Sequence, residues 1–135
     1  MNGSVVLAAI VFAVFGSYWI PKLVVSLMPT QDLKRKYDAQ WALVTGSSSG
    51  IGKSLASRLA SQGLNIVMVA LNDRLLDDAV SELKTTFKSG QFIKVGVDLG
   101  VPGYLDIIAE ATKDLDVQIV FNNAGFMLTG FFDKQ

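Results

Sequence analysis

A run of glycines and serines, LVTGSSSGIGKS at residues 43–54, is the part of this sequence whose residue types and spacing most clearly indicate chemistry. Glycines at positions 46, 50 and 52 have a spacing that suits a dinucleotide-binding turn between a strand and a helix. In such a turn Gly46 lets the chain bend sharply, Gly50 admits a pyrophosphate, and Gly52 lets the helix pack against the sheet. Backbone N–H groups at the helix N-terminus bind the phosphates, and we expect the serine hydroxyls at 47–49 to add further donors.

Three other interpretations fit parts of the same run. A nucleotide P-loop, GxxxxGK[ST], would share Gly52-Lys53-Ser54, but it needs its first glycine at position 47, which is Ser47. The sequence Gly46-Ser47-Ser48-Ser49-Gly50 matches the nucleophile elbow GxSxG, but such a serine needs a histidine base and the chain has no histidine. A glycine–serine loop without a ligand is the third interpretation, and the glycines alone leave it open.

The composition excludes several classes of site. The 135 residues include no cysteine and no histidine, and 12 basic residues balance 12 acidic ones. Without cysteine the chain has no disulfide and no thiolate ligand, and without histidine it has neither a Ser–His–Asp triad nor an imidazole metal ligand. We therefore expect no metal site. A net charge of zero argues against nucleic acid as a partner, since phosphate binding needs an excess of lysine and arginine.

Strand-like and helix-like segments alternate from residue 41 onward, and these elements must position the glycine run. Short, nearly continuous apolar stretches predict strands at 41–45, 64–70, 91–97 and 117–121. Amphipathic stretches between the strands predict three helices, with Gly63 and Gly90 as left-handed C-cap residues of the first two. This order is typical of right-handed βαβ units in a parallel sheet. We therefore predict an α/β fold, a partial Rossmann (doubly wound parallel) sheet made of one half plus one strand.

The N-terminal segment predicts a transmembrane helix. Residues 3–20 contain no charge, and about 20 apolar residues are needed to cross a bilayer. Tyr18 and Trp19 stand where aromatic rings favour the headgroup region. A cleaved signal peptide fits less well because no basic residue precedes the run, and a buried core helix fits less well because the run has no polar face. The nearby basic residues all follow the run, so the positive-inside rule predicts an outside N-terminus and a cytosolic remainder; they are Lys22, Lys34, Arg35 and Lys36.

Three parts of the chain follow from these patterns. Residues 1–22 are the predicted transmembrane helix. We expect Pro21 to stop this helix, and Pro29 to prevent helix beyond it. Residues 23–40 are a predicted juxtamembrane linker, a spacer whose basic cluster lies near anionic headgroups. Residues 41–135 are the predicted N-terminal half of a Rossmann dinucleotide-binding domain.

Several motifs together resemble one family. Thr45-Gly46-xxx-Gly50-Ile51-Gly52 resembles the cofactor motif of the short-chain dehydrogenase/reductase family, and Asn122-Asn123-Ala124-Gly125 resembles its NNAG motif. Asp98 matches the acidic residue of that family that faces the adenine. With the N-terminal apolar helix and the run KYDAQWALVTG at 36–46, the sequence is most similar to the membrane-anchored branch, which includes 3-oxoacyl-CoA reductases and 17-beta-hydroxysteroid dehydrogenases. The resemblance implies a location in the endoplasmic reticulum membrane.

The resemblance also implies roles for individual residues. Asp98 would accept a hydrogen bond from the adenine amino group, and Asn122 would tether neighbouring strands. A strand-end cap is the alternative for Asp98, and a buried structural amide is the alternative for Asn122. The loop at 46–51 would line the pyrophosphate, and 123–125 would border the nicotinamide ribose. The full set of predicted cofactor-binding residues is Gly46, Ser48, Ser49, Gly50, Ile51, Gly52, Asn72, Arg74, Asp98, Leu99, Asn123, Ala124 and Gly125.

The choice of cofactor depends on the end of the second predicted strand. An acidic residue there would bind the ribose 2′-OH of NAD, and an arginine would bind the 2′-phosphate of NADP. Leu71 stands where the membrane-anchored relatives tend to carry arginine, while Asp73 and Arg74 are offset from that position. Because no acid stands at position 71 and Arg74 is near, NADP(H) is favoured and NAD(H) stays open.

The resemblance implies catalytic residues that we do not find here. The family uses a tyrosine as proton donor, a lysine four residues after it, and a serine, all in the second half of its domain. We expect none of Tyr18, Tyr37 and Tyr104 to be that donor, so we predict no catalytic residue and no activity in this chain alone. Two functions remain: the dinucleotide-binding portion of a membrane-anchored reductase of lipid-like ketones, or a non-catalytic membrane subunit. For the non-catalytic subunit we expect a second copy of the chain or a partner chain to cover the open sheet edge.

Overall fold

The computed structural model describes residues 3–126, and the chain divides between Gln31 and Asp32 into two compact units. The first unit contains one helix, α1 (Gly3–Leu27), with Pro21 inside it. The prediction that Pro21 ends this helix is wrong. A proline inside an apolar helix disturbs one turn without stopping the residues beyond it. The helix ends instead at Leu27, because Pro29 disfavours a helical backbone at Met28, the residue before it.

The helix α1 is long and apolar enough to cross a membrane. Its segment Ile10–Leu27 has a mean hydropathy of 1.7 over 18 residues, none of it buried. The ammonium group of Lys22 lies 5.8 Å from the ring centre of Tyr18 and 5.3 Å from that of Trp19. These three side chains thus form one polar–aromatic cluster, of the kind that favours the headgroup region of a bilayer.

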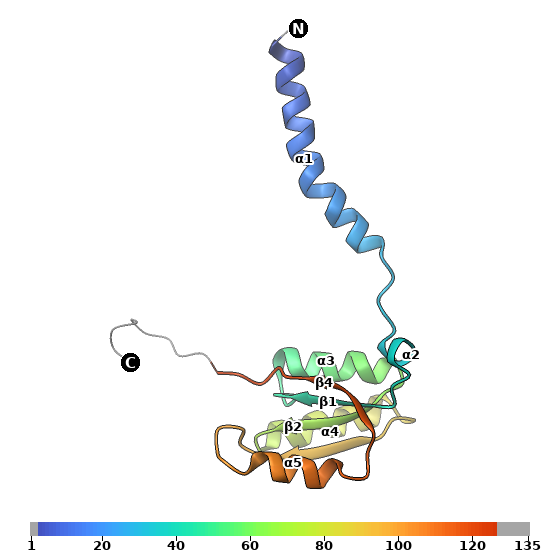
Figure 1. Cartoon of the computed structure of the whole chain (residues 1–135), viewed down its shortest axis with the longest axis vertical. Helices are drawn as coiled ribbons and strands as arrows, with labels where there is room; N and C mark the ends of the chain where they lie inside the picture. The colour runs from blue at the N-terminus through green and yellow to red at the C-terminus, as the bar shows by residue number, and fades with distance from the viewer. Residues whose placement is uncertain (1–2, 127–135) are drawn as a thin grey trace, which may run out of the picture. The chain divides into compact units, whose positions relative to one another are not determined.

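The second unit is a parallel four-stranded sheet with helices on both faces (Figure 1). Its elements are α2 (Leu33–Tyr37), β1 (Trp41–Thr45), α3 (Gly50–Ser61), β2 (Asn65–Ala70), α4 (Arg74–Thr86), β3 (Phe92–Gly96), α5 (Tyr104–Thr112) and β4 (Val117–Phe121). The strand order is β3-β2-β1-β4, the beginning of the usual Rossmann order 3-2-1-4-5-6. The predicted fold class is therefore confirmed, and each predicted strand starts and ends within one residue of the observed one.

Two apolar cores hold the helices against the sheet. Alternate residues of the central strands point to opposite faces, and both faces of β1 and β2 are buried. On one face Ala42 and Val44 pack with Leu59 of α3 and Leu76 of α4. On the other face the residues of the sheet pack with Ile108 of α5. β1 and β2 are thereby fixed in the middle of the fold, and their carboxyl ends are held close together.

Part of the predicted linker is a folded element of the second unit. Asp32 caps the N-terminus of α2 by accepting a hydrogen bond from Arg35 N at 3.1 Å. Leu33 packs against the apolar core, and Lys34 Nζ donates to Gly63 O at 2.7 Å. Asp38 ends the helix in the left-handed conformation, at φ 48°. The interpretation of these residues as a polar spacer is wrong, because the one apolar side chain among their charges is enough to seat a single helical turn.

Of the two predicted C-cap glycines, one is confirmed. Gly63 has φ +82° and follows α3 with its N–H donating to Ala60 O at 2.9 Å. Gly90 is not among the glycines of positive φ. The helix α4 ends at Thr86, and its C-cap residue Phe87 is not left-handed. A Cβ at Gly90 would lie 2.8 Å from the ring of Phe92, so close packing explains this glycine.

The sheet has two edge strands, β3 and β4. Among the described residues β4 pairs only with β1, and Val120 on it is 55% exposed. The pairing shifts register between Trp41 and Ala42. There the amide oxygen of Gln118 accepts N–H groups from Gln40 at 3.0 Å and from Trp41 at 3.1 Å.

Candidate dinucleotide site

A cavity of about 690 Å³ lies at the carboxyl ends of the strands, which is where open α/β sheets bind ligands. Its volume is within the range of about 300–1,000 Å³ for small-molecule sites. The residues that line it are Gly46, Ser48, Ser49, Ala70, Leu71, Asp73, Val97, Asp98, Leu99, Gly100, Asn123, Ala124, Gly125 and Phe126. They come from the loops after β1, β2, β3 and β4, so the fold brings together motifs that lie up to 80 positions apart.

The three glycines of the first loop have three different roles. Gly46 has φ +64°, and a Cβ on it would lie 3.0 Å from Ala124 Cα. Gly52 is buried in the first turn of α3, where a Cβ would lie 2.2 Å from Gly46 O. Gly50 has φ +55°, and no atom lies within 4 Å of the place where its Cβ would stand. Gly46 and Gly52 are therefore required by packing within the protein, whereas the space beside Gly50 is open.

The hydroxyl of Thr45 joins the first loop to the end of β4. Its oxygen accepts hydrogen bonds from Asn123 N and Ala124 N, both at 2.9 Å. In turn the side-chain amide of Asn123 donates to Thr45 O at 3.1 Å. The predicted tether between strands is thus made by Asn123 rather than by Asn122, which is exposed. Thr45 is 8% exposed, and this arrangement fixes 123–125 beside the glycine loop.

The serines of the loop divide into one structural residue and two that face the cavity. Ser47 is fully buried, and its hydroxyl donates to Val69 O at 3.3 Å. The expectation that it supplies a donor to phosphate is therefore wrong. Ser48 and Ser49 line the cavity. Ser49 is the N-cap residue of α3, and its side chain makes no capping hydrogen bond, so its hydroxyl does not already serve the helix.

The residues after β3 take part both in a turn and in the cavity. Asp98 Oδ1 accepts a hydrogen bond from Gly100 N at 2.8 Å, which is the cap proposed as the alternative role for this residue. The same exposed carboxylate lines the cavity with Leu99. Both interpretations of Asp98 therefore fit its position.

The loop after β2 differs most from the prediction. Arg74 does not line the cavity; its side chain is 93% exposed and its Nε lies 3.5 Å from Asp78 Oδ2. Asn72 also lies outside the lining, packed so closely on Gly96 that a Cβ there would stand 2.6 Å from Asn72 Cβ. Leu71 and Asp73 line the cavity instead. Asp73 also caps α4 by accepting a hydrogen bond from Leu76 N at 3.0 Å. An aspartate directly before an amphipathic helical pattern is a typical N-cap, so the sequence could have predicted this role.

None of the described tyrosines lines the cavity. Tyr18 does stand four residues before Lys22, the spacing of the family's catalytic pair, but both belong to α1 in the first unit. Tyr37 belongs to α2, and Tyr104 packs partly buried against the second core. The ionisable side chains of the lining are Asp73 and Asp98, and each accepts a backbone hydrogen bond from its own turn.

Comparison with known proteins places this geometry in context. The family model described as short chain dehydrogenase matches residues 40–135. The chain is 40% identical over 95 residues to the inactive hydroxysteroid dehydrogenase-like protein 1 of Homo sapiens, covering 70% of this chain and 28% of that protein. It is 37% identical over 86 residues to the very-long-chain 3-oxoacyl-CoA reductase of Homo sapiens, covering 64% and 27%.

A solved structure extends the likeness to three dimensions. L-sorbose reductase from Gluconobacter frateurii, solved with NADPH and L-sorbose, matches with a TM-score of 0.67 at 32% identity, covering 72% of this chain and 37% of that one. The chain therefore spans about a third of the length of the proteins it resembles.

Proposed function

The chain belongs to the short-chain dehydrogenase family, and from that membership we propose that it binds a nicotinamide dinucleotide in the cavity at the carboxyl ends of β1 to β4. We further propose that it is the dinucleotide-binding part of a membrane-anchored reductase of lipid-like ketones. One observation carries the proposal: the glycine loop, the turn after β3 and the residues after β4 line one cavity.

The residues of the first loop fit a pyrophosphate. Gly50 leaves open space beside the backbone at the start of α3, and helix N-termini attract anions. Ser49 has a hydroxyl there that α3 does not use. Thr45 and Asn123 hold the end of β4 at the other side of the cavity, where 123–125 would border the nicotinamide ribose. When bound, the nicotinamide ring would supply the hydride, and these residues would orient it.

For the adenosine end we propose a preference for NADP(H). Leu71, which lines the cavity after β2, is not acidic, and the carboxylate of Asp73, which also lines it, already caps α4. Arg74 lies three residues after Leu71, at the start of α4. Its ion pair with Asp78 is fully on the surface, and such a pair contributes only about 0.3–0.5 kcal/mol. The 2′-phosphate of NADP(H) could therefore replace Asp78 as the partner of the Arg74 guanidinium at little cost in free energy.

Membrane anchoring and a lipid-like substrate are also part of the proposal. The apolar segment of α1 is long enough to span hydrocarbon, and Lys22 with its two aromatic neighbours would lie at the cytosolic headgroups. The 3-oxoacyl-CoA reductase and the hydroxysteroid dehydrogenase-like protein that the chain resembles have names that point to acyl-thioester or steroid ketones.

The experiment that tests dinucleotide binding replaces Gly50 by alanine. Gly50→Ala fills the open space beside the helix N-terminus, so we expect at least a tenfold weaker affinity for NADPH, about 1.4 kcal/mol. Alanine at positive φ also carries a backbone strain of about 1–2 kcal/mol. Gly103→Ala is the matched control, because Gly103 has φ +94° and open space but no neighbour in the cavity lining, whereas Gly50 directly follows the lining residue Ser49. Fluorescence titration of the full chain in detergent that gave equal affinities for the two variants would refute the proposal.

The cofactor preference is tested at Arg74. We expect Arg74→Ala to weaken NADPH binding about tenfold while NADH binding changes less than twofold, since only NADPH carries the 2′-phosphate. Asp78→Ala is the control, because it removes the partner of Arg74 and leaves the guanidinium in place. Equal losses for both cofactors would contradict a role for Arg74 in the choice.

A further inference from the structure

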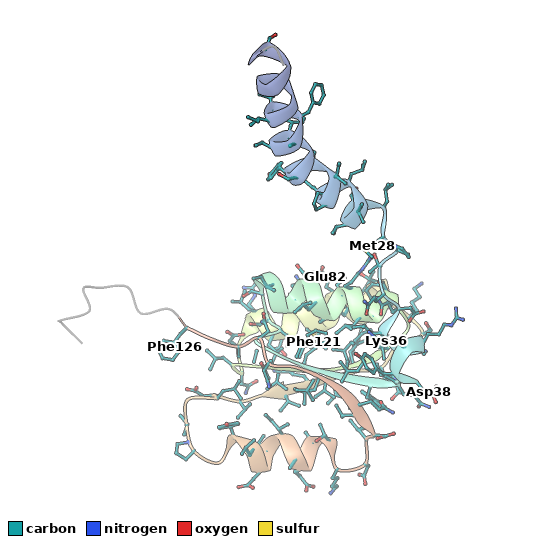
Figure 2. All side chains as sticks on the ribbon, turned by 45° about the horizontal axis from the view of Figure 1, so that its top comes forward. Met28, Lys36, Asp38, Glu82, Phe121 and Phe126 are labelled. Atoms are coloured by element: carbon teal, nitrogen blue, oxygen red, sulfur yellow. The ribbon has the colours of Figure 1, made fainter. Side chains whose placement is uncertain are left out.

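The helix α2 presents basic side chains at the edge of the sheet where the strands begin. Lys34, Arg35 and Lys36 are all exposed. Their helix is held in place from two sides, since Lys34 Nζ donates to Gly63 O at 2.7 Å and Leu33 N donates to Gln62 Oε1 at 2.9 Å. Figure 2 shows Lys36 at this end of the sheet and Phe126 beyond the opposite end. The basic cluster is therefore fixed at the edge opposite the cavity.

The two edges of the sheet differ in the balance of their charges: basic residues outnumber acidic ones at the first edge, where Asp32, Asp38, Asp114 and Asp116 also lie. Further basic residues at the first edge are Arg58 and Lys84 in the last turns of α3 and α4, and Lys88 in the loop before β3. At the cavity edge acidic residues outnumber Lys53 and Arg74. These acidic residues are Asp73, Asp77, Asp78, Asp98 and Asp106. Basic residues in a last turn are favoured by the helix dipole. That reason does not account for three consecutive basic residues in α2, which is a single turn of 5 residues.

Chain connectivity limits how far this edge can be from the end of α1. Only residues 28–31 separate Leu27 from Asp32, and this connection spans at most about 18 Å. Tyr37 adds a second feature that suits an interface: it is 56% exposed, and the ammonium of Lys36 lies 5.4 Å from its ring centre. Paired aromatic and basic side chains favour the headgroup region.

We propose that this basic edge, formed by Lys34, Arg35, Lys36 and Lys88, docks on the anionic headgroups of the bilayer that α1 enters. The inference rests on the proposed membrane anchor. Attraction of about 1 kcal/mol for each basic residue near the surface holds the edge against the lipid. The strands are 5 or 6 residues long, which separates the two edges by about 17–20 Å. The cavity then opens to water on the side away from the lipid, where a dissolved dinucleotide reaches it without crossing the headgroups.

Single cysteine labels make this orientation measurable, because the chain contains no cysteine. The full chain is reconstituted in nanodiscs of phosphatidylcholine and phosphatidylserine that contain lipids with a nitroxide on the headgroup. A fluorophore is attached through Ser89→Cys at the basic edge or through Val101→Cys at the cavity edge, both exposed positions. We expect strong quenching at position 89, little at position 101, and loss of the difference in pure phosphatidylcholine or at high salt.

Charge variants test which residues are responsible. Replacing Arg35 and Lys36 together by glutamine should lower the ratio of docked to undocked molecules about 30-fold, or about 2 kcal/mol for two charges. The control replaces Lys53 and Lys94 together by glutamine, which removes the same charge from ion pairs with Glu82 and Asp77 away from this edge. We expect this control to keep the quenching at position 89.

The outcomes separate the two proposals. A chain that does not co-elute with nanodiscs would overturn the anchor and this inference together. A chain that co-elutes but is quenched equally at positions 89 and 101, or whose quenching is lost equally in both charge variants, would overturn the docking alone.

Discussion

At the scale of single residues, the Thr45 hydroxyl is the contact on which the position of the last cavity wall depends. It accepts two backbone N–H groups, from Asn123 and Ala124, and valine has the same shape without an acceptor. We expect Thr45→Val to lower the free energy of unfolding by about 2 kcal/mol, because buried donors lose their partner. Thr45→Ser keeps the acceptor and should lose less than half as much. Urea unfolding followed by the fluorescence of buried Trp41, with Trp19 replaced by phenylalanine, would measure both; equal losses would contradict the role.

A site residue could be predicted from the sequence where local backbone packing determines its identity, and not where a contact with a distant segment does. The glycine spacing fixed Gly46 and Gly52 because backbone packing at 2.2–3.0 Å leaves no room for a side chain. The tethering role of Asn123 could not be predicted, since it depends on which amide the turn after β4 directs toward Thr45. The direction of the Arg74 side chain could not be predicted either, because it pairs with Asp78, one helical turn further along α4.

At the scale of elements, α1 carries the prediction about topology. Its 25 residues correspond to about 37 Å of helix, longer than the ~30 Å of hydrocarbon. We expect the chain to stay in the membrane pellet after carbonate extraction, with its second unit in the cytosol. Lys84→Asn creates a glycosylation acceptor with Thr86 on the exposed side of α4. This acceptor should stay unmodified, whereas an acceptor added before residue 3 should be glycosylated. Modification at position 84 or release by carbonate would contradict the topology.

The elements themselves were predictable to different degrees. The strands follow from continuous apolar runs buried on both faces, a pattern that depends little on distant contacts. The helix α2 was not predicted because tertiary contacts stabilise it: Leu33 packs against the core and Lys34 donates a hydrogen bond to Gly63 O. Pro21 does not end α1, because apolar helices that can span a membrane tolerate an internal proline that would break most soluble helices.

At the scale of the whole molecule, the question is whether residues 1–135 alone can reduce a ketone. Hydride delivery to a carbonyl leaves an alkoxide that must receive a proton as it forms. A general acid contributes roughly 10²–10⁴-fold, and a donor to the developing oxyanion a further 10²–10³-fold. Among the described residues the cavity lining has no tyrosine, lysine or histidine, and its two carboxylates serve as caps. Val120 and Phe126 are 55% and 87% exposed on the β4 side, so water reaches the place where the nicotinamide would lie.

We therefore expect the 135-residue polypeptide to bind dinucleotide weakly and to show no turnover. The measurement is NADPH absorbance over time, with the chain in nanodiscs and with long-chain 3-oxoacyl thioesters and steroid ketones as substrates. Gly50→Ala is the control that distinguishes turnover at this cavity from a contaminant, because it should abolish only the former. Turnover that disappears in Gly50→Ala would overturn the argument. It would mean that a group outside the described lining, such as Tyr104 or Lys53, reaches the cavity and supplies the proton.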